Sequence, residues 1–277
     1  MTITLPFTTK LAETSIAIDA AIQAGKDVMK IYESEFNSSL KKDNEPITEA
    51  DIKSNETIHN MLSKTNIPLL SEEDADNNRL IHDKIWIVDP LDGTSDFINK
   101  TGEFTIMIAL VYGHKPVLGI IYWPTKNKLY VAQKKEGAYQ LVEKKWKKLS
   151  VSDISSLEKC RVVGSRYHLS EPEKKFINTM KKVLIQRGSS LKIIDICSGD
   201  AELYFTTTNK IKQWDTCASY CLITEAGGKM TDMKGEELEY NTYMLNHENG
   251  ILSTNGLLHN TIIESYSKFL KQYTNIT

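Results

Sequence analysis

The sequence predicts an α+β or layered α/β protein with a mixed sheet. Two segments of helical periodicity come first, a run of short strands follows them, and helical and strand patterns alternate in the second half. Turn signals such as Gly113, Pro124 and Gly137 separate the strands of the middle run, which is typical of an antiparallel meander. We expect two lobes, an N-terminal α+β lobe over residues 1–153 and a C-terminal α/β lobe over residues 154–277.

The first half contains two predicted helices, over residues 9–32 and 50–62. Residues 69–70 and 86–88 are typical of strands, and Pro90 is expected to end the second one. The meander is predicted over residues 105–112, 117–123, 128–132 and 137–141. The lysine-rich run 144–148 could suggest nucleic-acid binding, but a solvated hairpin or edge strand explains it better, because lysines discourage edge pairing.

The second half is expected to alternate strands and helices. Residues 161–164 and 191–194 are predicted strands, and residues 171–187 are a predicted helix with Pro172 near its start. A helix over residues 215–226 should end at Gly227 and Gly228. Apolar residues at helical spacing predict a closing helix whose buried stripe is Leu258, Ile262, Tyr266, Phe269 and Tyr273.

Composition narrows the class of protein. The 277 residues include 34 basic and 36 acidic side chains, and 40% are hydrophobic, so the chain can bury an ordinary core. The net charge of −2 argues against binding a nucleic-acid polymer. No apolar run reaches the roughly 20 residues of a membrane span, and the N-terminus lacks signal-peptide features. We expect a cytoplasmic protein, with peripheral contact to the inner face of the membrane left open.

The cysteines do not indicate a metal site or a disulfide framework. Cys160, Cys197, Cys217 and Cys221 form no CxxC pair and have no zinc-type spacing. We expect them to be reduced, buried, small apolar side chains.

The most informative motif follows the strand at residues 86–88. Asp89 and Asp92 stand three residues apart beside Pro90 and Gly93, and the amides of Gly93 and Thr94 would open a helix near Ser95. Magnesium prefers carboxylate oxygens together with water and substrate phosphate, and amides at a helix start favour phosphate. The motif therefore predicts metal-assisted phosphoryl chemistry. The alternative is that Asp92 only caps a helix.

Three further acids could join this pair. Glu72 follows the strand at residues 69–70, Asp51 opens the second helix, and Asp215 opens a later one. Each acid taken alone fits a helix cap or a surface position better than a catalytic role.

Taken together, these motifs resemble the inositol monophosphatase superfamily of lithium-sensitive, magnesium-dependent phosphomonoesterases. The matching motifs stand in the family's order over residues 46–228: Pro46-Ile-Thr-Glu-Ala-Asp51, Ser71-Glu72-Glu73, Asp89-Pro-Leu-Asp92-Gly93-Thr94, and Trp214-Asp215 with Glu225-Ala-Gly-Gly228. The resemblance implies a layered αβαβα sugar-phosphatase fold, two or three Mg²⁺ ions and hydrolysis by an activated water without a phosphoenzyme.

A closer resemblance is to the 3′(2′),5′-bisphosphate nucleotidase branch. It is carried by Gly102-Glu103-Phe104-Thr105, Ser165-Arg166-Tyr167-His168 and Gly188-Ser189-Ser190-Leu191-Lys192. Four positions depart from the expected patterns. Ser95-Asp96 replaces a Lys-Glu pair, Ser219 stands at a common glycine, and Thr208 stands where inositol-specific members carry a sugar-binding glutamate.

The resemblance also implies roles for individual residues. One Mg²⁺ would be held by Glu72, Asp89 and the Leu91 carbonyl. A second would be held by Asp89, Asp92 and Asp215, and a third ion could lie near Glu72. Glu72 would activate the attacking water with Thr94 and Asp51. The substrate-binding residues would be Gly93, Thr94, Ser95, Ser165, Arg166, His168, Ser190, Lys192 and Asp215.

The expected activity is hydrolysis of adenosine 3′,5′-bisphosphate or its sulfated form to AMP or adenosine phosphosulfate, a step of sulfur metabolism. The alternatives are an inositol or sugar phosphatase and, from a different class, a non-catalytic binding protein on the same fold. A small phosphorylated molecule is the expected partner, and a monomer and a homodimer both remain open.

Overall fold

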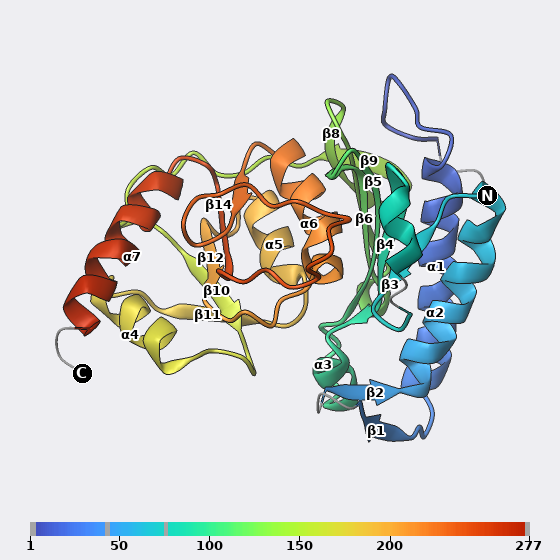
Figure 1. Ribbon diagram of the computed structural model, residues 1–277, viewed down its shortest axis with the longest axis horizontal. Helices are drawn as coiled ribbons and strands as arrows, with labels where there is room; N and C mark the ends of the chain where they lie inside the picture. Colours follow the sequence, from blue (N-terminus) through green and yellow to red (C-terminus); the bar gives the residue numbers. More distant parts are fainter. Residues whose placement is uncertain (1–3, 42–44, 75–76, 275–277) are drawn as a thin grey trace.

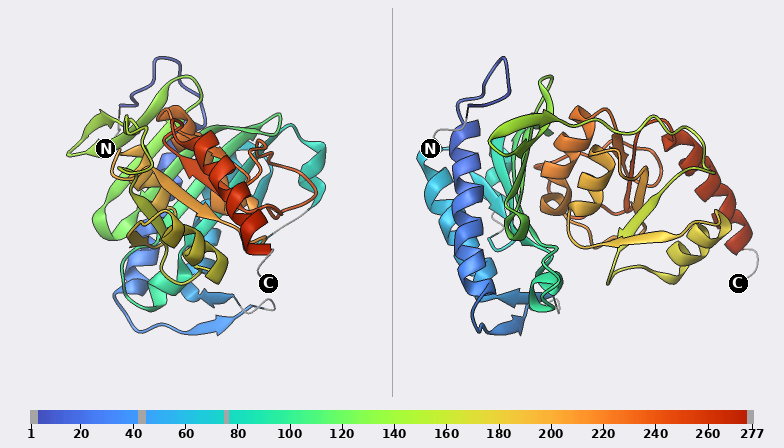
Figure 2. Two further views of the ribbon diagram at one scale, coloured as in Figure 1. Left: turned by 90° about the vertical axis from the view of Figure 1, so that its left-hand side faces the viewer. Right: turned by 180° about the vertical axis from the view of Figure 1, so that it is seen from behind.

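The protein, described by a computed structural model over residues 4–41, 45–74 and 77–274, has five layers that alternate helices and sheets (Figure 1). Helices α1 (Thr14–Tyr32) and α2 (Glu49–Leu62) form one outer layer, and α4 (Glu171–Thr179) and α7 (His259–Thr274) form the other. Helices α5 (Leu191–Cys197) and α6 (Gln213–Glu225) lie between the two sheets, as the views in Figure 2 also show. The predicted αβαβα class is confirmed.

The larger sheet has seven strands in the order β3-β4-β5-β6-β7-β8-β9. Their bounds are β3 Leu69–Ser71, β4 Lys84–Asp92, β5 Thr105–Tyr112, β6 Lys115–Trp123, β7 Lys128–Gln133, β8 Gly137–Val142 and β9 Lys145–Lys148. All neighbours are antiparallel except β3 and β4. The predicted meander is therefore confirmed, and the lysine-rich run is the edge strand β9.

Pro90 does not end its strand, so that prediction is wrong. Strand β4 continues to Asp92, and its register against β5 shifts between Asp89 and Asp92. A bulge tolerates proline because the extra residue needs no ladder hydrogen bond. The Pro90 carbonyl instead accepts a hydrogen bond of 2.6 Å from Ser54 Oγ in α2.

The smaller sheet has the order β11-β10-β12-β14-β13. Its strands are β10 Val162–Ser165, β11 Leu184–Arg187, β12 Leu203–Thr206, β13 Lys229–Thr231 and β14 Ile251–Thr254. Residues 203–206, 229–231 and 251–254 had not been predicted as strands. A small hairpin of β1 (Ser38–Leu40) and β2 (Pro46–Thr48) and a short helix, α3 (Thr94–Ile98), lie together below the larger sheet (Figure 1).

Two predictions for the second half are wrong, the first in the extent of a helix and the second in the type of element. The helix expected over residues 171–187 ends at Thr179, and residues 184–187 pair in parallel with β10. Lys181 adopts a positive φ of 55°, which stops the helix, and Val183 is 88% exposed rather than buried. The strand expected at residues 191–194 is instead the start of α5.

Small residues bring the first helix close to the larger sheet. Its buried face includes Ala17, Ala21, Ala24 and Val28, and the helix starts at Thr14 rather than at residue 9. A Cβ on Gly25 would lie 2.3 Å from Tyr122 Cε1 of β6, so only glycine permits this approach.

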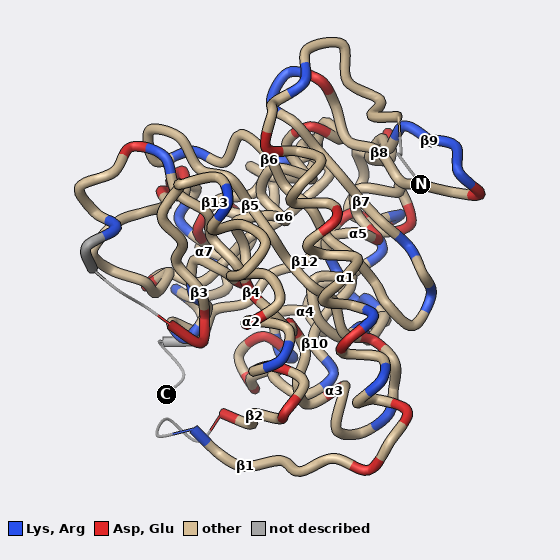
Figure 3. The backbone as a smooth tube through the Cα atoms, turned by 90° about the vertical axis from the view of Figure 1, so that its right-hand side faces the viewer, with Lys and Arg blue, Asp and Glu red and all other residues tan. Residues whose placement is uncertain are grey.

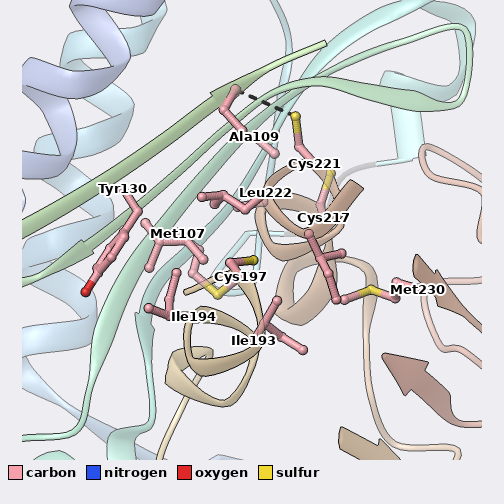
Figure 4. Close-up of a cluster of buried hydrophobic side chains, with 14 of the residues drawn as sticks. Met107, Ala109, Tyr130, Ile193, Ile194, Cys197, Cys217, Cys221, Leu222 and Met230 are labelled. Atoms are coloured by element: carbon pink, nitrogen blue, oxygen red, sulfur yellow. Dashed lines mark hydrogen bonds between the residues drawn. The ribbon is translucent and has the colours of Figure 1, made fainter. Parts of the chain in front are cut away.

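The other face of the sheet packs on the middle helices through a buried cluster that includes Met107, Ile194 and Leu222 (Figure 4). All four cysteines are free and buried, as expected. Leu258, Ile262 and Tyr266 of the closing stripe are buried, whereas the side chain of Tyr273 lies outside the described residues. Within the described chain, no helix combines the length and apolar character needed to cross a membrane.

Candidate active site

The site forms where β4 ends. Asp89 is 1% exposed, and its Oδ1 accepts a hydrogen bond of 3.0 Å from the Leu91 amide within the bulge. Glu72 is brought alongside because its amide donates to the Val88 carbonyl at 3.2 Å. The parallel pairing of β3 with β4 therefore places two acids from separate motifs at one end of the sheet.

Asp92 connects the two halves of the chain. Its Oδ2 accepts hydrogen bonds from the Ser190 amide at 2.5 Å and from Thr105 Oγ1 at 3.3 Å. Gly93 follows in the left-handed region at φ 95°, and a Cβ there would lie 3.0 Å from Ser189 Cβ. A side chain at Gly93 would therefore strain the turn and push it away from the segment before α5.

Asp51 both caps a helix and reaches into the site. Its Oδ2 accepts hydrogen bonds of 2.7 Å from the Thr48 amide and from Thr48 Oγ1, and the first of these is one half of the capping box at the start of α2. Its Oδ1 accepts a 2.9 Å hydrogen bond from Thr94 Oγ1. The capping role that the sequence predicts for Asp51 therefore also orients its second carboxylate oxygen toward Thr94.

Asp215 has the same double role in the second half. It is the third residue of α6, and its Oδ2 accepts a 2.7 Å hydrogen bond from the Lys212 amide. Beside it, Thr216 Oγ1 lies 2.8 Å from His247 Nε2 and accepts a 3.1 Å hydrogen bond from the Tyr240 hydroxyl. This buried network fixes the first turn of α6 and with it the position of Asp215.

Four carboxylates therefore form an electrostatic cluster: Glu72, Asp89, Asp92 and Asp215. Burial, followed by repulsion from the other three acids, raises the pKa of Asp89 well above its usual value. Burial and repulsion from Glu72 and Asp92 likewise raise the pKa of Asp215. Without a cation these acids favour their neutral forms, and a cation bound among them would favour the charged forms.

Lys41 supplies part of that positive charge. Its Nζ lies 2.6 Å from Glu72 Oε1 and 2.6 Å from Glu73 Oε1. Burial would lower the pKa of Lys41, but its two carboxylate partners raise it instead. The lysine acts as a stand-in cation on Glu72, which indicates that this position suits a positive ion.

The donor set fits Mg²⁺ chemically, since it consists of carboxylate oxygens with the Leu91 carbonyl nearby. As they stand, no three His, Cys, Asp or Glu side chains of the described residues converge closely enough to hold a metal ion. The repulsion among the acids and the salt bridges from Lys41 explain this arrangement physically.

The structure separates the predicted phosphate-binding residues into two environments. Lys192 Nζ donates to the Ser189 carbonyl, and burial lowers its pKa although Asp92, Asp96 and Asp215 act to raise it. Arg166 instead forms ion pairs with Asp96 and, at 2.7 Å, with Glu103. Lys192 therefore lies against the acid cluster, whereas the guanidinium of Arg166 is engaged by acids of the α3 region.

The remaining predicted substrate residues lie at the end of β10, in the turns that follow strands, and in the short helix α3. Ser165 Oγ accepts hydrogen bonds from the amides of Tyr167 and His168 at 3.3 and 3.1 Å, and His168 is exposed. Ser190 Oγ lies 2.7 Å from Thr105 Oγ1, and Ser95 is half-buried in α3. None of these contacts assigns a ligand, so their substrate roles remain predictions.

The sequence does not reveal two features of the site, the salt bridges of Lys41 and the ion pairs of Arg166. Lys41 was not singled out, because a lysine in a polar segment gives no signal of its long-range partner. The ion pairs of Arg166 belong to a chain that continues from Glu103 to Arg187 at 3.2 Å and from Arg187 to Asp195 at 2.7 Å. This chain ties the loop after α3 to β10, β11 and α5.

Comparison with known proteins agrees with this geometry. The model of the inositol monophosphatase family matches residues 11–270. The 3′(2′),5′-bisphosphate nucleotidase CysQ of Buchnera aphidicola (subspecies Acyrthosiphon pisum, strain APS) is 37% identical over 229 residues, covering 79% of this chain and 84% of the relative.

Solved structures show the same relationship. The crystal structure of CysQ from Bacteroides thetaiotaomicron, described as a bacterial member of the inositol monophosphatase family, is similar with a TM-score of 0.74 and 35% identity, covering 87% of this chain and 96% of that one. The structure of an IMPase/NADP phosphatase complexed with Mg²⁺ and phosphate has a TM-score of 0.75 at 20% identity, covering 88% and 90% of the two chains. At that identity the second likeness shows the fold alone.

Proposed function

The chain belongs to the inositol monophosphatase family, and from this premise we propose that it is a Mg²⁺-dependent 3′(2′),5′-bisphosphate nucleotidase. The proposed reaction removes one phosphate from adenosine 3′,5′-bisphosphate or its sulfated form and leaves AMP or adenosine phosphosulfate. The observation that carries the chemistry is the cluster of buried, mutually repelling acids at the end of β4. The choice of substrate rests on the similarity to the CysQ proteins.

The residues proposed to hold the metal are Glu72, Asp89, Asp92, Asp215 and the Leu91 carbonyl. When bound, Mg²⁺ supplies positive charge that polarises the phosphate and favours ionisation of an attacking water. Before the ions bind, Glu72 has to be released from Lys41, since the same carboxylate oxygen accepts from the ammonium group.

The protein's own part in the reaction is to orient and accept a proton. We assign Thr94 Oγ1 to hold the attacking water, because its hydroxyl is itself fixed by Asp51 at 2.9 Å. Glu72 would accept the proton, as the resemblance to the family implies, since a carboxylate beside the attacking water can act as a general base. The amides of Gly93 and Thr94 would donate hydrogen bonds to phosphate oxygens.

The second phosphate of the substrate needs a cation that an inositol monophosphate would not use. Lys192 is the stronger candidate, because its ammonium is buried beside Asp92 and Asp215. Arg166 can contribute only after leaving its two carboxylate partners. Thr208, at the position of the inositol-binding glutamate, further favours a nucleotide substrate over inositol phosphates.

Phosphate release with Mg²⁺ tests the proposal. Adenosine 3′,5′-bisphosphate, inositol 1-phosphate and fructose 1,6-bisphosphate are compared at equal concentration, with and without excess EDTA. We expect the nucleotide to be hydrolysed fastest, and activity to vanish in EDTA and return with Mg²⁺. Lys192→Ala should lower kcat/KM for the nucleotide about tenfold to a hundredfold and narrow its advantage over inositol 1-phosphate. Turnover in EDTA, or a preference for inositol 1-phosphate, would contradict the assignment.

A further inference from the structure

A second cleft, of about 510 Å³, lies between the strands β7–β9 and the segment that runs from β11 into α5. Its walls include Trp123, Lys128, Tyr130, Lys147, Lys148 and Arg187. None of the acids proposed to hold Mg²⁺ lines it. The volume lies within the range of small-molecule sites, roughly 300–1,000 Å³.

Tyr130 offers the cleft a hydrogen-bond donor. The residue is only 2% exposed, but its hydroxyl is not one of the fully buried side-chain atoms that lack a partner among the described residues. Because Tyr130 lines the cleft, this hydroxyl can donate to a molecule bound there. Figure 4 shows the ring beside Ile194, with its hydroxyl directed away from the cysteines of the core. Burial, and more weakly Asp195, raise the pKa of this phenol, so it can act as a donor at neutral pH.

Charge indicates what the ligand should carry. Four cations and two carboxylates, Asp195 and Asp200, line the cleft, which leaves a net charge of +2. Arg187 is engaged by Asp195 and Glu103. In the described part of the chain, Lys128, Lys147 and Lys148 form no ion pair with any acid, and the lysines of strand β9 lie at the sheet edge (Figure 3). The unmatched charge therefore favours an anion.

The walls also provide apolar surface. Trp123 is half-buried, and its Nε1 donates a 2.7 Å hydrogen bond to the Gly102 carbonyl, which holds the indole in one orientation. Leu149, Leu191 and Ile194 are buried residues that line the same cleft. A ligand with a carbon skeleton would bury this surface, whereas an inorganic ion would not.

We propose that this cleft binds a small organic phosphate at a site separate from the acid cluster. In this arrangement, the phosphate meets Lys147 and Lys148 with the Tyr130 hydroxyl as a fixed donor. The organic part lies against Trp123 and the apolar wall of α5. Lys128, whose Nζ is 5.5 Å from the Trp123 ring centre, closes one side.

The test is a titration of tryptophan fluorescence in excess EDTA, which keeps Mg²⁺ from the acid cluster. AMP, glucose 6-phosphate and 3-phosphoglycerate are the probes, with inorganic phosphate as the comparison. We expect at least one organic probe to bind saturably and more tightly than inorganic phosphate. Lys147→Ala/Lys148→Ala should weaken it about tenfold or more, and Tyr130→Phe several-fold. Trp123→Phe should remove most of the fluorescence change.

The matched control is Lys144→Ala/Lys145→Ala, which removes the same charge from the same hairpin but outside the cleft. It should leave the affinity unchanged. The proposal is overturned by equal losses in both double variants, which would indicate unspecific attraction. It is also overturned if no organic probe binds up to about 10 mM, or if Asp92→Asn alters the binding while the cleft variants do not. A dimer that Lys147→Ala/Lys148→Ala converts to a monomer would assign the cleft to a second copy and would equally overturn it. These outcomes do not depend on turnover, so they are distinguishable from failure of the proposed activity.

Discussion

Replacing Thr94 by valine should separate catalysis from stability at the candidate site. Valine has nearly the shape of threonine but no hydroxyl, so Asp51 Oδ1 loses its 2.9 Å hydrogen bond and the attacking water loses its proposed partner. A group that positions or transfers a proton contributes about 10²–10⁴-fold to rate. We therefore expect kcat for adenosine 3′,5′-bisphosphate to fall by at least about a hundredfold.

The same change should destabilise the protein only moderately. Asp51 is 1% exposed, and leaving one of its oxygens without a donor costs about 1–3 kcal/mol. Thr48→Val is the matched control, because it removes the other hydroxyl that donates to Asp51, at 2.7 Å, and weakens the cap of α2 by about 0.5–2 kcal/mol. It leaves the Thr94 hydroxyl in place.

Phosphate release and thermal unfolding of both variants test whether the Thr94 hydroxyl has a catalytic role. We expect similar losses of Tm, a large loss of kcat in Thr94→Val only, and recovery of activity in Thr94→Ser. If Thr48→Val loses as much kcat as Thr94→Val, or if Thr94→Val retains activity within about threefold of the wild type, the hydroxyl does not have the assigned role.

Three further outcomes follow from the charges of the structure. Asp89→Asn should abolish turnover, yet in EDTA its Tm should equal or exceed that of the wild type, because one member of a self-repelling cluster is removed; a clearly lower Tm would make Asp89 structural. Lys41→Met should tighten Mg²⁺ binding in calorimetry by removing the ammonium group on Glu72, while Lys53→Met on the exposed face of α2 should not. Burial lowers the pKa of His247 to about 4, against about 6.5 when unfolded, so the unfolded state takes up the proton first as pH falls. The contribution of His247 should therefore lower the free energy of unfolding by about 2 kcal/mol between pH 7 and 5, and His247→Gln should remove that contribution when denaturant unfolding of the two proteins is compared across this pH range.

The elements predicted correctly from sequence are those whose periodicity reflects their own burial. Strands β5 to β8 alternate turn residues with apolar runs, and α6 ends at a glycine pair, so local sequence is enough. The helix predicted over residues 184–187 is wrong because a parallel strand is defined by its partner, here β10, and not by its own sequence pattern. The predicted end of β4 at Pro90 is wrong because the bulge that accommodates the proline depends on pairing with β5.

The candidate site shows a different limit. Asp51 and Asp215 look like helix caps in the sequence, and both are caps in the structure. A carboxylate has two oxygens, however, and in Asp51 the cap uses one while the other meets Thr94. For this residue the structural and functional interpretations were never exclusive. Lys41 could not be identified in advance, because its salt bridges join segments 31 and 32 residues apart in the chain.

The charged residues of the site come from both halves of the chain, so the site is complete only when the two halves pack together. Glu72 and Asp89 come from the larger sheet, Asp215 from α6, and Asp92 is bonded to the segment before α5. Among the described residues, Lys41 and Lys192 oppose these four acids, and burial lowers the pKa of Lys192. The order of the site should therefore depend strongly on bound cations. The packing of the layers should depend on them much less, since large buried clusters hold the layers on both sides. Removing metal should loosen the acids and the turn at Gly93 while leaving the five-layer fold intact.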